Sequence, residues 1–167
     1  MSHFVGEIRR FARGLPEDWI SCDGRVLPIG DHQPLFSLLG WRFGGDGRTT
    51  FSLPAVRSGV SKIEYGIACN GLYPTSDDVM LDNAYVGEIR LFGGERAPAG
   101  WLLCDGRSLP IGEPFLALFD VIGTAWGGDA EHFAIPDLRG IESDGPSGAV
   151  GRLSYIIAVA GQRQERT

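Results

Sequence analysis

The strongest constraint on the fold of this chain is an internal duplication. Residues Trp19–Gly30 read WISCDGRVLPIG and residues Trp101–Gly112 read WLLCDGRSLPIG, so nine of the twelve positions are identical. The sequence VGEIR precedes each copy, and FGGD or WGGD follows it. A period of about eighty residues is typical of two related structural units. We therefore predict one repeat in residues 1–74, a connector in 75–84 and a second repeat in 85–167.

Each repeat is predicted to be a small α+β module, in which a twisted, mainly antiparallel sheet carries one short helix. The 25 glycines and 10 prolines leave little room for long helices and favour short strands joined by turns. Leu27-Pro28 and Leu109-Pro110 are expected to leave the sheet, because proline cannot donate to a central ladder. The expected strands before them are Phe4–Phe11, Trp19–Cys22, Tyr85–Phe92 and Trp101–Cys104.

One helix is expected in each repeat. Leu35, Leu38 and Leu39 have the spacing of one helical face, and Gly40 follows at a typical left-handed C-cap position. The second repeat shares the pattern: Pro114 fits the first turn, Gly123 closes the helix, and the apolar face holds Phe115, Leu118, Phe119 and Ile122.

Composition argues against several classes of partner. The net charge is −6, with a sequence pI near 5.0 and no cluster of basic residues, so nucleic acid is not an expected partner. No apolar run is long enough for a transmembrane helix, so membrane insertion is not expected either. The N-terminus lacks the basic and apolar regions of a signal peptide. We expect synthesis in the cytoplasm, with any extracellular destination reached by lysis or dedicated export.

The duplicated Trp-x-x-Cys-Asp-Gly segment is predicted to be structural. Three cysteines do not make a disulfide framework, and Cys22 and Cys104 occupy equivalent positions, which favours two separate buried thiols. Cys69 is also expected in a core. Asp-Gly suits a turn with positive φ. The structural positions of this segment are Trp19, Cys22, Asp23 and Gly24 in the first repeat, and Trp101, Cys104, Asp105 and Gly106 in the second.

The Gly-Gly-Asp loops present two alternatives. A glycine-rich loop beside Asp46 or Asp129 is compatible with a phosphate or calcium site. However, the chain has neither a Gly-Lys-Ser/Thr motif nor the Asp-x-Asp-x-Asp-Gly spacing of a calcium loop. A structural turn is therefore favoured over a ligand site.

Neither catalysis nor a cofactor is predicted. The chain has no nucleophile elbow, no His-Glu-x-x-His and no dinucleotide fingerprint. The carboxylate pairs Asp77-Asp78 and Glu142 with Asp144 fall in polar loop sequence, where solvated charge is favoured over a glycosidase pair. His3, His32 and His132 are far apart in the sequence, and a zinc site within one chain needs several converging ligands. No metal site is predicted.

The ordered set of motifs resembles the phage tail collar family, which includes the microcystin-dependent proteins. The motifs are Val-Gly-Glu-Ile-Arg, Pro-x-Gly-Trp, Cys-Asp-Gly-Arg, Leu-Pro-Ile, Leu-Phe, Gly-Gly-Asp, Phe-x-Ile-Pro-Asp-Leu-Arg-Gly and Tyr-Ile-Ile-Ala. The resemblance covers nearly all of both repeats. It implies a non-catalytic protein of short tail fibres or phage-derived particles, acting in tail structure, adhesion or receptor contact, and it adds Pro136, Asp137 and Arg139 to the structural positions.

The chain departs from the family pattern in three places. The first repeat has Ala55 where the second has Asp137, and the insertion that many relatives carry before the closing strand is short in both repeats. The His-x-His zinc motif of short tail fibres is also missing. A threefold axis gathering three copies of His132 or His3 is an alternative to ordinary surface histidines.

The resemblance further implies self-association, with a trimer favoured. Three chains of two repeats would form six near-equivalent lobes, joined within each chain by the acidic segment Thr75–Asn83. Other tail or fibre proteins are the remaining expected partners. The alternative function is a lectin-like module that binds bacterial surface glycans through the aromatic residues Trp41 and Trp126 and the polar loop residues Asp46 and Asp129. Both tryptophans are otherwise expected to pack between helix and sheet. A polysaccharide-degrading enzyme ranks third.

Overall fold

The fold consists of two compact units. The computed structural model describes residues 3–56, 62–74, 84–139 and 153–163. Internal contacts among these residues place 3–56, 62–73, 91–95 and 153–154 in a first unit and the other described residues in a second unit. The connector Thr75–Asn83, the carboxylate pairs and the insertion of the second repeat lie outside the described residues.

Three strands of the first unit lie side by side in the main sheet. β5 (Glu64–Ala68) lies between β2 (Trp19–Ser21) and β1 (Glu7–Phe11), and both pairings are antiparallel. Ile67 is paired with Ile8 on one side and with Ile20 on the other. Its side chain is fully buried, so the centre of the sheet is also a centre of the core.

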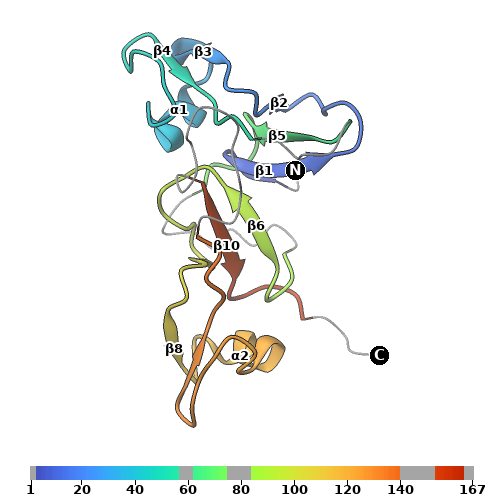
Figure 1. Ribbon diagram of the computed structural model, residues 1–167, viewed down its shortest axis with the longest axis vertical. Helices are drawn as coiled ribbons and strands as arrows, with labels where there is room; N and C mark the ends of the chain where they lie inside the picture. The colour runs from blue at the N-terminus through green and yellow to red at the C-terminus, as the bar shows by residue number, and fades with distance from the viewer. Residues whose placement is uncertain (1–2, 57–61, 75–83, 140–152, 164–167) are drawn as a thin grey trace. The chain divides into compact units, whose positions relative to one another are not determined.

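A two-stranded ribbon and a helix complete the repeated part of the first unit. β3 (Val26–Pro28) pairs with β4 (Thr50–Ser52), and between them the chain forms the 3-10 turn η1 (Ile29–Asp31) and α1 (Gln33–Leu39). The helix lies beside the ribbon (Figure 1). Phe36 of α1 contacts Phe51 of β4, with ring centroids 5.4 Å apart. Leu35 and Leu39 are fully buried, as the helical spacing predicts.

The first unit also includes Leu91–Glu95, a segment that the sequence places in the second repeat. β6 (Ile89–Phe92) carries Leu91 and Phe92, which pair with Ile8 and Glu7 of β1. Phe92 packs edge-on against Phe4, with ring centroids 5.7 Å apart. We call Leu91–Glu95 the cover segment, because it buries apolar residues of the first unit. Sequence reasoning did not predict it.

The second unit repeats this plan. β10 (Ser154–Ala158) lies between β6 and β7 (Trp101–Leu103), while β8 (Ser108–Pro110) pairs with β9 (His132–Ala134) beside α2 (Leu116–Ile122). The ring centroids of Phe119 and Phe133 are 5.3 Å apart, and this contact is equivalent to the one between Phe36 and Phe51. The buried core consists of Val86, Cys104, Leu109, Leu118, Phe133, Ile135 and Ile157.

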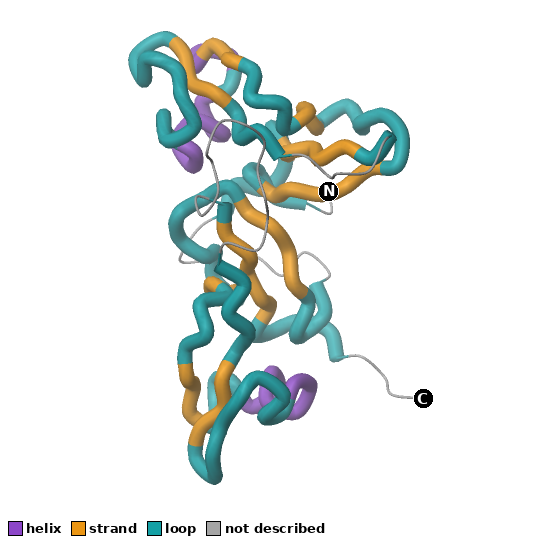
Figure 2. The backbone as a smooth tube through the Cα atoms, viewed as in Figure 1, coloured by secondary structure: helices purple, strands orange, loops and turns teal. Residues whose placement is uncertain are grey.

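The predicted α+β class is confirmed, with short strands, two short helices and long loops (Figure 2). Three local predictions need correction. The opening strands begin later than expected, because Gly6 and Gly87 adopt φ of 86° and 85°. Leu27-Pro28 and Leu109-Pro110 leave the main sheet but enter the ribbons. Pro114 precedes α2, which starts at Leu116.

In each unit a residue that follows the central strand, β5 or β10, contacts the helix, and the two contacts differ in chemistry. In the first unit the hydroxyl groups of Ser37 and Tyr73 are 2.5 Å apart. In the second unit the equivalent pair is Asp120 and Arg163, with 3.7 Å between Oδ2 and Nη2. The two repeats have kept the contact and changed its residues. In the described part of the chain, no helix has the length and apolarity needed to cross a membrane.

Candidate functional site

The duplicated Trp-Cys-Asp-Gly segment forms the anchor between sheet and ribbon in both units. Trp19 and Trp101 start the equivalent strands β2 and β7 and are buried, as are Cys22 and Cys104. The guanidinium of Arg9 lies 5.4 Å from the Trp19 ring centroid, and that of Arg90 lies 5.0 Å from Trp101. Sequence analysis missed this cation–π contact, although the repeated VGEIR motif was its signal.

A glutamate two residues earlier holds each of these arginines, and it is buried in the first unit and partly exposed in the second. Glu7 is fully buried, and its carboxylate accepts hydrogen bonds from Arg9 Nε at 2.6 Å and from the Phe4 amide at 3.2 Å. Glu88 accepts the same two kinds of bond, from Arg90 at 2.8 Å and from the Tyr85 amide at 3.0 Å. Glu-x-Arg therefore fixes the turn before the opening strand and orients the guanidinium over tryptophan.

The Asp-Gly-Arg turns are closed by an ion pair between residues two apart. Asp23 accepts hydrogen bonds from Arg25 Nε and Nη2, at 3.0 and 2.7 Å, and from the Arg25 amide at 3.1 Å. Gly24 has φ of 81°, a conformation that glycine adopts without steric cost. The side-chain hydrogen bond from Arg25 lowers the pKa of Asp23, so the turn remains an ion pair at neutral pH.

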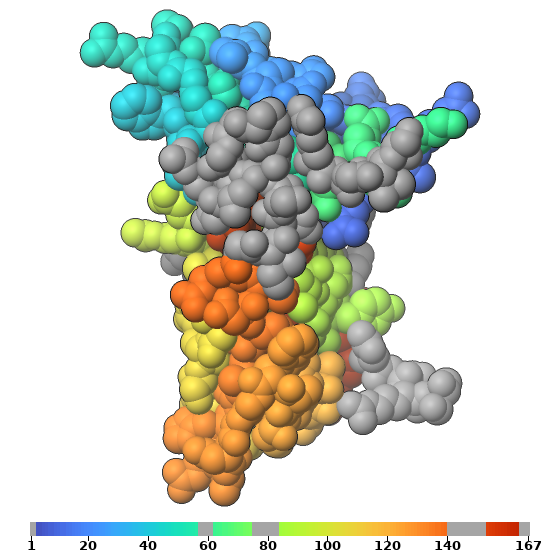
Figure 3. Space-filling model, viewed as in Figure 1, coloured from blue at the N-terminus to red at the C-terminus, as the bar shows by residue number. Residues whose placement is uncertain are grey.

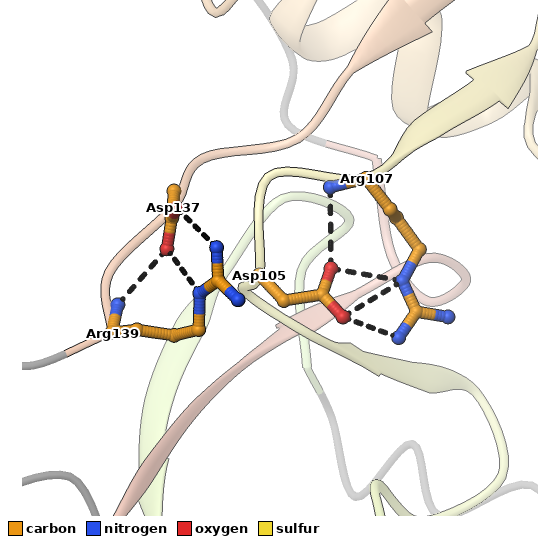
Figure 4. Close-up of polar contacts among 4 residues, drawn as sticks. All are labelled: Asp105, Arg107, Asp137 and Arg139. Atoms are coloured by element: carbon orange, nitrogen blue, oxygen red, sulfur yellow. Dashed lines mark hydrogen bonds and ion pairs between the residues drawn. The ribbon is translucent and has the colours of Figure 1, made fainter.

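The second unit places two such turns side by side. Asp105 pairs with Arg107 at 2.6 Å and Asp137 pairs with Arg139 at 2.7 Å (Figure 4). An isolated β-bridge joins Asp105 to Asp137, and a methyl group placed on Gly106 would lie 3.0 Å from Asp137 Cβ. Pro136 is buried and its carbonyl accepts the Gly106 amide at 3.2 Å. We call these four charged residues the paired turns.

Each acid in the paired turns is held in its charged form. The side-chain hydrogen bond from Arg139 holds the pKa of Asp137 at about 2, and the one from Arg107 lowers the pKa of Asp105. The hydrogen bond with Asp137 raises the pKa of Arg139, and the charge of Asp105 adds to this. A carboxylate that stays ionised and paired holds a turn in shape and is poorly suited to donate a proton.

The first unit has only one of the two turns in its described residues. Ala55 forms the bridge to Asp23 that Asp137 forms to Asp105, and its methyl group approaches Gly24 at the place where Asp137 approaches Gly106. Arg57 lies outside the described residues. The departure seen in the sequence therefore removes one ion pair and keeps the backbone geometry.

The acidic residues of the Gly-Gly-Asp loops are engaged by their own loops. Asp46 Oδ1 accepts the amides of Arg48, Thr49 and Thr50 at 2.8 to 2.9 Å, and Oδ2 accepts the Thr49 hydroxyl at 2.7 Å. Asp129 Oδ1 accepts the amides of Glu131 and His132, both at 2.8 Å. These bonds favour the structural interpretation of both residues.

The two tryptophans next to these loops face solvent. Trp41 is 65% exposed and Trp126 is 55% exposed, so neither packs between helix and sheet. Trp41 lies against the Gly-Gly-Asp-Gly loop, since a methyl group placed on Gly47 would meet its ring at 3.0 Å. The two residues are not equivalent: counted from Gly40 and Gly123, Trp126 corresponds to Phe43.

The cysteine thiols have raised pKa values, and one histidine lies near an acidic residue. Burial raises the pKa of Cys104 to about 12 and raises that of Cys22 still further, while Cys69 is only half-buried and also has a raised pKa. His132 Nδ1 lies 3.5 Å from Asp129. Within the described ranges, no three His, Cys, Asp or Glu side chains converge as a metal ion requires.

A comparison with known families gives one finding. The family model described as Phage Tail Collar Domain matches the chain twice, at residues 6–60 and 87–142, which together make up more than half of its length. These two ranges contain the duplicated anchor, the ribbon and the helix of each unit. No curated protein and no solved structure matches the chain at a significant level.

Proposed function

Because the chain belongs to the phage tail collar domain family, whose members are structural proteins of tail fibres, we propose that it serves in assembly of a phage tail or phage-tail-derived particle and in attachment to the host surface. The observation that carries the proposal is the double family match over two units of the same plan. Its expected location is the virion tail or an extracellular particle, at a collar, fibre or distal tip.

The turns that the two units share support a structural role. Charged residues at the turns are paired with neighbours two residues away, and the duplicated thiols are buried. Such turns present a fixed surface at low cost in conformational entropy, which favours binding between preformed partners. We further propose self-association, with a trimer of six near-equivalent lobes as the favoured form.

Electron microscopy of the assembled particle tests the proposed location. Particles carrying a tagged chain and labelled with an antibody to the tag should show label at one defined level of the tail. Particles that lack the chain should lose that density and bind host cells less. Complete, infectious particles with no label on the tail would contradict the proposal.

A second candidate is a lectin-like role in contact with host glycans, supported by the exposure of both tryptophans. An exposed indole offers a flat apolar face on which a sugar ring stacks. Trp41→Ala and Trp126→Ala should then weaken binding to cells or to a glycan array while leaving assembly intact. Phe43→Ala is a control at the position equivalent to Trp126. Absence of cell binding by the parent chain would exclude this candidate.

A further inference from the structure

The two units differ in one respect that their shared plan does not explain: an apolar face that is covered in the first unit is open in the second. In the first unit the cover segment Leu91–Glu95 lies on this face. The Gly93 amide donates to the Gly6 carbonyl at 2.9 Å, and Arg42 binds the Gly93 carbonyl and lies 3.5 Å from Glu95. The cover segment is therefore held by backbone and side-chain bonds.

The covered residues and their equivalents have different exposures. Phe4 and Ile8 are 0% and 4% exposed, whereas the equivalent Tyr85 and Ile89 are 45% and 39% exposed. Leu39, the last residue of α1, is fully buried under Gly93, whereas Ile122, the last residue of α2, is only partly buried. Part of the yellow-green segment that contains β6 reaches the surface in Figure 3.

The backbone at the centre of this face has the same conformation in both units. Gly6 and Gly87 have nearly equal positive φ. A methyl group placed on Gly6 would lie 3.1 Å from the Phe92 ring and 3.2 Å from Leu38. On Gly87 it would lie 3.0 Å from Val121, the equivalent of Leu38, and next nearest to Ile122. The helix side chain beside the glycine is thus present in both units, whereas the aromatic ring is present only in the first.

One sheet position explains why Phe11, the equivalent of Phe92, stays within its own unit. Phe11 is the equivalent of Phe92, and it packs over Gly66 of its own unit, 3.1 Å from the position of a methyl group there. The residue equivalent to Gly66 is Ile156, which is fully buried. The first unit therefore has room for its own phenylalanine, while the isoleucine occupies that space in the second.

We propose that the open face, formed by Tyr85, Ile89 and Ile122 around Gly87, is an interface that a second copy of this chain covers. In the first unit the same face, built from the same repeat, is already covered by a segment of this chain. Exposed apolar residues grouped on one face mark a site of association. The inference deepens the proposed self-association by assigning a surface to it.

The test measures mass and amide protection in the full chain. Light scattering should give a mass that is a multiple of 18.0 kDa. Hydrogen exchange at Tyr85–Ile89 should slow as the chain concentration rises, while exchange at Val5–Arg9 stays constant. Ile89→Arg should shift the mass toward the monomer, and its melting temperature should equal that of the parent at concentrations low enough for both chains to be monomeric. Val26→Arg, at a more exposed position in the first unit, is the matched control and should retain the parent mass.

Three results would overturn the inference. They are a parent chain that is monomeric at every concentration, an Ile89→Arg chain that retains the parent mass, and protection of Tyr85–Ile89 that arises only when other tail proteins are added. If Ile89→Arg fails to fold, Tyr85→Ser and the concentration dependence in the parent chain decide. A monomer that microscopy still places in the tail would overturn this inference and the proposed self-association, and would leave the proposed place in the tail standing. An assembly through this face that is missing from tails would overturn the proposed place in the tail alone.

Discussion

The carboxylate of Asp46 accepts four hydrogen bonds from the loop in which it lies, and three of the donors are backbone amides. The Thr49 hydroxyl bond, together with these amides, lowers the pKa of Asp46 well below its usual range. A carboxylate in this position replaces the partners that loop amides would otherwise find in water. A single residue thus shapes the loop that sequence analysis also considered as a ligand site.

The Asp46 bonds predict a pH dependence. An aspartate in the unfolded chain has a pKa of about 3.9, and the pKa of Asp46 in the folded chain is lower. The stabilisation is therefore present above about pH 4 and is lost as the pH falls from there. Asp46→Asn should therefore lower the melting temperature at pH 7, and the difference from the parent should shrink toward pH 3. Asp31→Asn removes the same charge from η1 and is the control. Equal melting temperatures at pH 7 would contradict the prediction.

The core of the second unit gives a second prediction at this scale. Leu118 is fully buried in α2, whereas Leu116 of the same helix is 37% exposed. Leu118→Ala should lower the free energy of unfolding by about 2–5 kcal/mol, because it leaves a cavity. Leu116→Ala should change it far less. Urea denaturation of both variants checks the contrast, and equal losses would show that the buried face has been misassigned.

At the scale of elements, we infer that the residue at one sheet position, Gly66 or Ile156, determines where the side chain of Phe11 or Phe92 packs. A side chain at Gly66 would meet Leu15 at 2.9 Å and Phe11 at 3.1 Å. Gly66→Ile should therefore destabilise the chain by about 1–3 kcal/mol through overpacking. Adding Phe11→Ala should recover part of this loss, because the two changes are coupled. Additive effects in denaturation experiments would contradict the proposed steric conflict.

The elements that the sequence predicted are those with local causes. The helices follow from leucine and phenylalanine spacing, and the Asp-Gly turns follow from glycine at positive φ. The Glu-x-Arg contact with tryptophan was missed, because it joins β1 to β2 and β6 to β7 across the sheet. The exposure of Trp41 and Trp126 was not predictable either, since an aromatic beside a helix has the same pattern whether it packs inward or faces solvent.

At the scale of the whole molecule, the boundaries of the repeats in sequence and of the units in space differ. The period places Leu91–Glu95 in the second repeat, yet these residues complete the first unit. No periodicity carries this information, because the equivalent residues 10–14 of the first repeat have no such role. We infer that their different packing depends on Gly66 and Ile156, which lie far from them in the sequence.

Phe92 tests this division. Its side chain is 1% exposed and packs on Phe4 and above Gly6, so Phe92→Ala should cost about 3–5 kcal/mol, the range for large core aromatics. The loss should fall on the first unit, although Phe92 belongs by sequence to the second repeat. Hydrogen exchange should then quicken in β1 and β5 more than in β8 and β9, and Phe133→Ala, within the second core, should give the reverse pattern. Equal acceleration in both units after Phe92→Ala would mean that the chain unfolds as one cooperative body, because the loss of one core contact would then be shared by all of its strands.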